Sequence, residues 1–140
     1  MCDDHGCPTL DGKDASAVAR HYLRHVGTDW GEAAMDCVLL ATSELVTNAT
    51  IHGGDCPTLD VRTSSGTVRV EVYDGGPTPR DWLHHIDDCG EPTGTRPDDD
   101  LRLGGRGLRI VDTLSERWGV RPQPPGKVVW FEMPLGRAAP

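Results

Sequence analysis

The chain has 140 residues, the size of one ordinary domain, which leaves no room for a second. Its 14 basic and 22 acidic residues give a formal net charge of −8, which argues against sequence-independent nucleic-acid binding and disfavours anionic membranes. No apolar run approaches the roughly 20 residues of a spanning helix, and the amino terminus lacks a basic start and an apolar stretch of signal type. We therefore expect a cytoplasmic protein.

The five cysteines do not form the pattern of a disulfide framework, because their number is odd and they are scattered at positions 2, 7, 37, 56 and 89. Cys37 is expected to be a small core residue. Cys2, His5 and Cys7 could form a metal site, but their spacing is not that of a zinc pair and no second pair follows. We favour a flexible tail over residues 1–13.

A single domain is predicted over residues 14–135, followed by a short tail at 136–140. Residues 14–26 have the apolar spacing of a short amphipathic helix. After a break at Gly27, residues 32–52 predict a longer helix whose buried face recurs every three or four residues, at Ala34, Val38, Ala41, Leu45 and Ala49.

Four strands are predicted, at residues 58–63, 67–73, 118–121 and 127–133. The first two should pair as a hairpin, because Ser64, Ser65 and Gly66 between them favour a turn. Residues 77–103 are rich in proline and glycine and predict a mobile loop with one short helical turn, and residues 107–117 return to helical spacing. These elements predict an α/β (α+β) sandwich of two layers, with helices on one face of a mostly antiparallel sheet.

Two segments suggest the halves of a nucleotide site. Glu44 and Asn48 lie four residues apart on one helix face, where one side chain can orient a water while the other reaches a metal ion. Considered alone, such a pair is more often a solvated stripe. Gly105 and Gly107 precede an apolar helix, where backbone N–H groups can approach phosphate oxygens, although glycines in this pattern are usually turn residues.

A third segment lies between these two and strengthens the interpretation. The strand from Val68 to Tyr73 alternates in polarity and runs directly into Asp74, Gly75 and Gly76. An acidic residue and glycines at a strand end, combined with the other two segments, make ATP the leading ligand.

In order and spacing, residues 44–53, 73–79, 104–120 and 126–131 resemble the N, G1, G2 and final-strand motifs of the GHKL ATPase superfamily. More narrowly, the phrases Glu-Leu-Val-Thr-Asn-Ala, Gly-Arg-Gly-Leu-Arg-Ile-Val and Gly-Lys-Val-Val-Trp-Phe-Glu resemble its actinobacterial branch of anti-sigma factors and serine-protein kinases. The resemblance covers about Ala15 to Pro134. It implies the Bergerat ATP-binding fold, with a mixed, mostly antiparallel sheet and a lid over residues 81–105.

The resemblance also implies roles for single residues. Glu44 matches the residue that activates the attacking hydroxyl or water, and Asn48 matches the Mg²⁺ ligand. Asp74 matches the carboxylate that accepts a hydrogen bond from the adenine amino group, and Gly76 matches a glycine that gives the base access to the backbone. Gly105 and Gly107 match the glycines that cradle phosphates, in a cofactor-binding segment that also contains Arg106 and Leu108.

Several residues of this region carry a second interpretation. Arg106 is as readily a surface arginine as a phosphate ligand. His52 is expected to cap or pack, and Asp98 to Asp100 to be a solvated charge run. Val128 replaces a hydroxyl residue that is common in this branch near the phosphates or adenine, and Pro77 departs from the longer glycine motif of the wider superfamily.

By the resemblance, the protein would phosphorylate a serine or threonine of an anti-sigma-antagonist protein and would bind a sigma factor, with ATP and Mg²⁺ as cofactors. The alternative is a catalytically inactive, ATP-dependent module that binds a partner. Residues 14–26 are, by analogy, a candidate homodimer interface.

Overall fold

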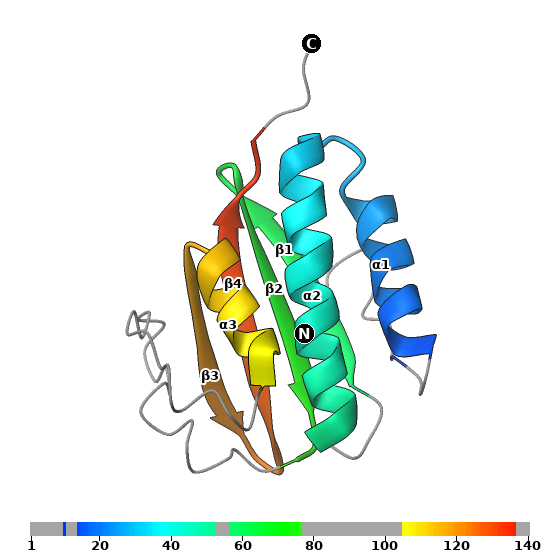
Figure 1. Ribbon diagram of the computed structural model, residues 1–140, viewed down its shortest axis with the longest axis vertical. Coiled ribbons are helices and arrows are strands. Elements are labelled where there is room, and N and C mark those ends of the chain that lie inside the picture. Colours follow the sequence, from blue (N-terminus) through cyan, green and yellow to red (C-terminus); the bar gives the residue numbers. More distant parts are fainter. Residues whose placement is uncertain (1–9, 11–13, 53–56, 77–104, 137–140) are drawn as a thin grey trace.

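The computed structural model describes residue 10 and residues 14–52, 57–76 and 105–136 of the protein (Figure 1). The elements in chain order are α1 (Ala15–Val26), α2 (Glu32–His52), β1 (Thr58–Ser64), β2 (Thr67–Asp74), α3 (Gly105–Leu114), β3 (Arg117–Gln123) and β4 (Gly126–Pro134). No helix in these ranges is long and apolar enough to cross a membrane.

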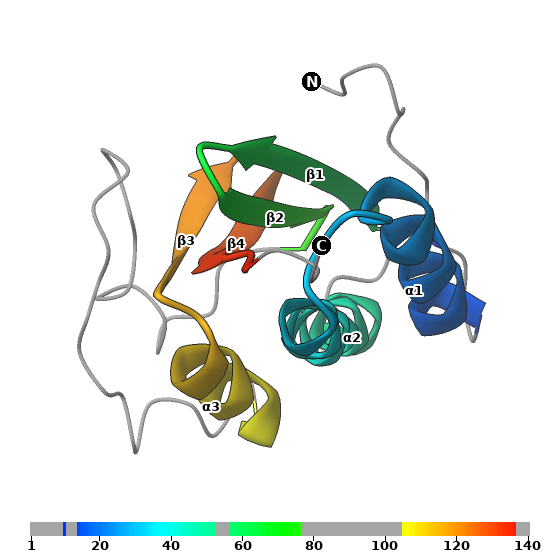
Figure 2. The same ribbon diagram turned by 90° about the horizontal axis from the view of Figure 1, so that it is seen from above.

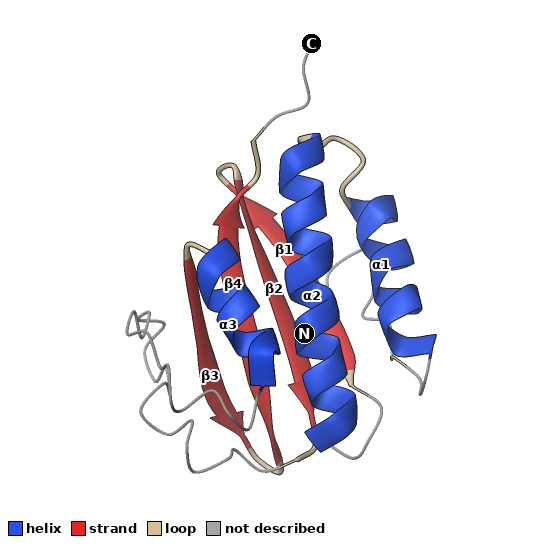
Figure 3. Ribbon diagram, viewed as in Figure 1, coloured by secondary structure: helices blue, strands red, loops and turns tan. Residues whose placement is uncertain are grey.

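The strands form one sheet in the order β1-β2-β4-β3, and every described pairing is antiparallel. All three helices cover the same face of this sheet, as Figures 2 and 3 show. The predicted two-layer α+β architecture is confirmed.

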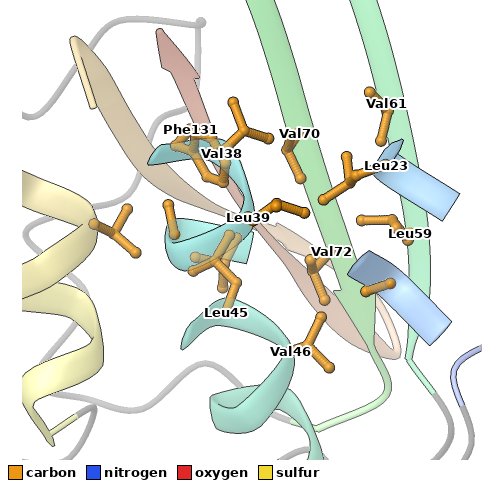
Figure 4. Packing of buried hydrophobic residues seen from close by; sticks show 14 of the residues in the cluster. Leu23, Val38, Leu39, Leu45, Val46, Leu59, Val61, Val70, Val72 and Phe131 are labelled. Atoms are coloured by element: carbon orange, nitrogen blue, oxygen red, sulfur yellow. The ribbon is translucent and has the colours of Figure 1, made fainter. Parts of the chain in front are cut away.

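The inner face of the sheet follows from strand alternation. On β2, Val68, Val70 and Val72 are buried, and their cross-strand partners on β4 are Met133, Phe131 and Val129. This row packs against apolar side chains of α1 and α2, including Leu23, Val38, Leu45 and Val46 (Figure 4). The buried faces of the strands, which repeat every two residues, and those of the helices, which repeat every three to four, thus form one core.

The long helix α2 has the predicted bounds and buries most of the predicted face, at Val38, Ala41, Leu45 and Ala49. Leu39 and Val46 are buried as well. The reason is that α2 packs against α1 and α3 in addition to β2 and β4, so that more than one side of the helix is covered.

The hairpin between β1 and β2 is confirmed, with Ser65 at φ 52° and Gly66 at φ 80° in its turn. The α3 helix begins and ends earlier than predicted. It stops at Leu114. The Ser115 N–H still makes a helical bond to the Val111 carbonyl, but the Glu116 N–H donates instead to the Glu132 carbonyl on β4, so the chain leaves the helix at this point.

Leu10 is fully buried and its N–H donates to the Pro57 carbonyl at 2.7 Å, although it lies within the range predicted as a tail. The predicted loop at 77–103 and its helical turn lie outside the described residues.

The face of the sheet away from the helices carries a network of ion pairs. Arg69 donates to Glu71 at 2.7 Å and to Glu132 at 2.8 Å, and the Nε of Arg117 donates to Glu132 at 3.0 Å. The Arg69 guanidinium also lies 4.0 Å from the centre of the Trp130 ring. Trp130 is therefore buried beneath a charged layer rather than beneath a helix.

This network makes stability depend on pH. Burial alone would raise the pKa of Glu132, but hydrogen bonds from Arg117 and Arg69 outweigh it and hold that pKa below the ordinary 4.5. The lowered pKa means that the stabilisation is complete above the unfolded pKa and is lost as the pH falls through the folded pKa. In urea unfolding, Glu132→Gln should lower the free energy of unfolding at neutral pH by about 1 kcal/mol.

The same variant should also lose less stability than the wild type on acidification. Asp36→Asn, which changes an exposed carboxylate on α2, should keep the wild-type dependence on pH. Parallel pH profiles for Glu132→Gln and the wild type would contradict the assignment.

Candidate nucleotide-binding pocket

A pocket lies between α2 and the inner face of the sheet. It holds about 240 Å³ of empty space, including the part open to solvent. Its lining residues come from α2 (Leu45, Asn48 and Ala49), β2 (Val72 and Asp74) and β4 (Lys127 and Val129). The walls are thus mainly aliphatic, with three polar side chains among them, which is the usual make-up of a small-molecule site.

Asp74 and Lys127 form the last cross-strand pair on the helix-facing side of β2 and β4. The preceding pairs on that side are apolar. They are direct cross-strand partners, and each is 1% exposed. The Lys127 ammonium donates to Asp74 Oδ1 at 2.8 Å, and the Gly76 N–H donates to the same oxygen at 2.8 Å. A buried carboxylate requires such partners, because an uncompensated charge away from water is strongly unfavourable.

The close approach of the two strand ends depends on Gly126. A Cβ atom at this position would lie 1.9 Å from the carbonyl oxygen of Asp74, so any side chain would collide with the backbone of β2. Gly126 thus lets the start of β4 reach the residue that carries the carboxylate.

Asn48 enters the pocket from the opposite wall. Its amide nitrogen Nδ2 is buried and has no hydrogen-bond partner among the described residues. The Asn48 amide therefore has unused hydrogen-bonding capacity inside the pocket. A buried polar group without a partner fits a site that holds a polar ligand or a metal-bound ligand.

Glu44 lies one turn before Asn48 on α2 and is half-buried, but it is not among the residues that line the pocket. The structure therefore joins Asn48 and Asp74 in one cavity and leaves Glu44 beside it. The catalytic role of Glu44 stays a prediction.

Gly105, Arg106 and Gly107 form the first turn of α3, which packs against α2. The start of α3 lies toward the end of the molecule where β2 ends and β4 begins (Figure 1). The first N–H groups of a helix have no partner within the helix, so this turn can donate to an anion. The structure does not describe the side chains of Arg106 and Leu108.

Other predicted site residues also lie outside the described part of the chain: Cys2, His5, Cys7, the His52 side chain, Pro77, Asp98 to Asp100 and most of the predicted lid. Within the described ranges, no group of three or more His, Cys, Asp or Glu residues could hold a metal ion.

The sequence motifs did not predict Lys127 as a site residue. They indicated the neighbouring Val128 instead, as a replacement for a hydroxyl residue near the nucleotide. Val128 is the cross-strand partner of Tyr73, on the face away from the helices, and does not line the pocket. Lys127 shares the inward face with Val129 and Phe131. A signal was present in the sequence, because Lys127 has the inward parity of an alternating strand.

The sequence from residue 11 to residue 133 matches the family described as histidine kinase-like ATPase domain. Among solved structures, full-length ShkA in complex with AMPPNP is similar with a TM-score of 0.53 and 25% identity, over 76% of this chain and 23% of the ShkA chain. The catalytic domain of histidine kinase ThkA in a nucleotide-free form has a TM-score of 0.50 and 21% identity, over 73% of this chain and 67% of that one, and shows likeness of fold alone.

No curated protein matches the chain. This chain spans about a quarter of the length of ShkA, at 23%. The family match, in contrast, extends over most of the 140 residues. The protein therefore belongs to the histidine kinase-like ATPase domain family.

Proposed function

We propose that the protein binds ATP with Mg²⁺ in the pocket between α2, β2 and β4. The observation that carries this proposal is that two polar groups line one largely aliphatic cavity: the buried carboxylate of Asp74, and the buried amide of Asn48, whose nitrogen has no partner among the described residues. Membership of a family of ATPase domains and the likeness to a protein in complex with AMPPNP support it.

Different pocket residues would contact the base, the metal ion and the phosphates of ATP. Asp74 Oδ2 would accept an N–H from the adenine amino group, while Val72 and Val129 would contact the base. The Asn48 amide oxygen would be the protein ligand of Mg²⁺. When bound, this ion would neutralise part of the phosphate charge. The backbone N–H groups of the first turn of α3 would donate to phosphate oxygens.

Glu44 would act as the base in phosphoryl transfer to a protein serine or threonine. Its carboxylate takes the hydroxyl proton as the hydroxyl oxygen forms a bond to the γ-phosphorus, and the bond from that phosphorus to the bridging oxygen of ADP breaks. The products are a phosphorylated protein and ADP.

The substrate would be an anti-sigma-antagonist protein, and the second partner a sigma factor, in the cytoplasm. This part of the proposal rests on the resemblance of the motifs at residues 44–53, 104–120 and 126–131 to those of anti-sigma regulators. Pairing of two copies through α1 remains a prediction by analogy.

Calorimetric titration of the full chain with ATP, with and without Mg²⁺, tests the proposal. We expect ATP binding that weakens at least about tenfold when Mg²⁺ is withheld, because the phosphate charge then faces the protein without a counter-ion. Absence of binding in both conditions would contradict it. Binding without transfer of phosphate to an antagonist protein would identify the alternative, a catalytically inactive ATP-dependent module.

A further inference from the structure

The two carboxylate oxygens of Asp74 differ in their remaining capacity to accept hydrogen bonds from a ligand. Oδ1 accepts from the Lys127 ammonium and from the Gly76 N–H, each at 2.8 Å. A carboxylate oxygen has about two lone-pair sites, so these donors use the capacity of Oδ1. Oδ2 has no hydrogen-bond partner within the described part of the chain, and Asp74 lines the pocket.

A purine would therefore meet a single acceptor at this point. Adenine matches it, because its exocyclic amino group donates one N–H in this direction. Guanine places two parallel donors side by side, the ring N1–H and the 2-amino N–H, and this fork needs both oxygens of a carboxylate. If guanine lay as adenine does, its O6 would instead face the negative Oδ2.

We infer that Lys127 is a specificity-determining residue, which makes the pocket select adenine over guanine by occupying Asp74 Oδ1. The inference rests on the nucleotide binding proposed above. An unpaired N–H of guanine in a buried site should weaken GTP binding about 10- to 100-fold relative to ATP.

The test compares ATP and GTP affinities of the full chain, with Mg²⁺, for the wild type and for Lys127→Met. Methionine has a similar length but no charge and no N–H, so it frees Oδ1 for a second donor. We expect the ratio of ATP to GTP affinity to fall at least about tenfold in the variant. Arg117→Met removes a cation from the Glu132 pair on the opposite face and should keep the wild-type ratio.

The possible outcomes separate this inference from the proposed function. A folded Lys127→Met protein with the wild-type ratio would overturn the inference, as would equal affinity of the wild type for the two nucleotides, and both results would leave ATP binding intact. If the wild type bound neither nucleotide, the proposed function itself would fail.

A second measurement uses the wild type alone, in case Lys127→Met does not fold. The chain contains only two lysines, Lys13 and Lys127, so ¹⁵N-lysine labelling yields two ammonium signals, which Lys13→Arg assigns. The Lys127 signal should keep its hydrogen-bonded character when ATP saturates the protein. Release of this ammonium into rapid exchange with water on ATP binding would overturn the inference.

Discussion

Asp74→Asn should weaken ATP binding about 10- to 150-fold. The substitution replaces a charged acceptor with an amide, and a hydrogen bond to a charged group contributes about 1.5–3 kcal/mol. It also leaves the buried Lys127 ammonium without a compensating charge. Calorimetry with ATP and Mg²⁺ measures the loss directly.

The same substitution should lower the free energy of unfolding by about 3–5 kcal/mol, as expected when one partner of a buried ion pair is removed. Asp60→Asn is a matched control, because Asp60 pairs with Arg62 at 3.0 Å where the Arg62 side chain is 55% exposed. This control should change stability by less than about 1 kcal/mol and leave ATP affinity unchanged. A folded Asp74→Asn protein with wild-type affinity would contradict the role of the carboxylate.

Glu44→Ala and Asn48→Ala should separate catalysis from binding. Glu44 does not line the pocket, so its removal should leave ATP affinity within about threefold while lowering the rate of phosphoryl transfer about 10²- to 10⁴-fold, the usual contribution of a general base. Asn48→Ala should abolish the Mg²⁺-dependent part of ATP affinity, because it removes the proposed protein ligand of the metal.

Titration with ATP in the presence and absence of Mg²⁺, followed by a single-turnover transfer assay, measures both effects. Thr47→Ala, an exposed change on the same helix, should affect neither quantity. Equal loss of binding in Glu44→Ala and Asn48→Ala would show that the two residues do not have separate roles.

Much of the fold could be predicted because apolar residues recur at regular helical and strand spacings along the chain. The bounds of α2 agree with its apolar repeat, and the turn at Ser65 and Gly66 defines the hairpin of β1 and β2. The end of α3 could not be predicted in the same way. The chain leaves that helix where the Glu116 N–H donates to the carbonyl of Glu132, a residue of β4 that is distant in the sequence.

The candidate site could be predicted in part. The resemblance to the G1 and N motifs predicts Asp74 and Asn48 as site residues, and the structure places both in one pocket. Periodicity alone does not show which charged groups pair across a sheet, so the contact between Lys127 and Asp74 required the register of β2 with β4. Trp130 shows the same limit, because alternation indicates that it is opposite in face to Phe131 but not that Arg69 covers it.

The central position of β2 and β4 gives the pocket two walls with different freedom to move. Each of these strands is hydrogen-bonded to a neighbour on both sides, so displacing the wall that carries Asp74 and Lys127 would break the backbone ladder of the sheet. The opposite wall belongs to α2, which is held to the sheet and to α1 and α3 by side-chain packing. A ligand in the cavity would therefore contact one wall held by backbone hydrogen bonds and another held by side-chain packing.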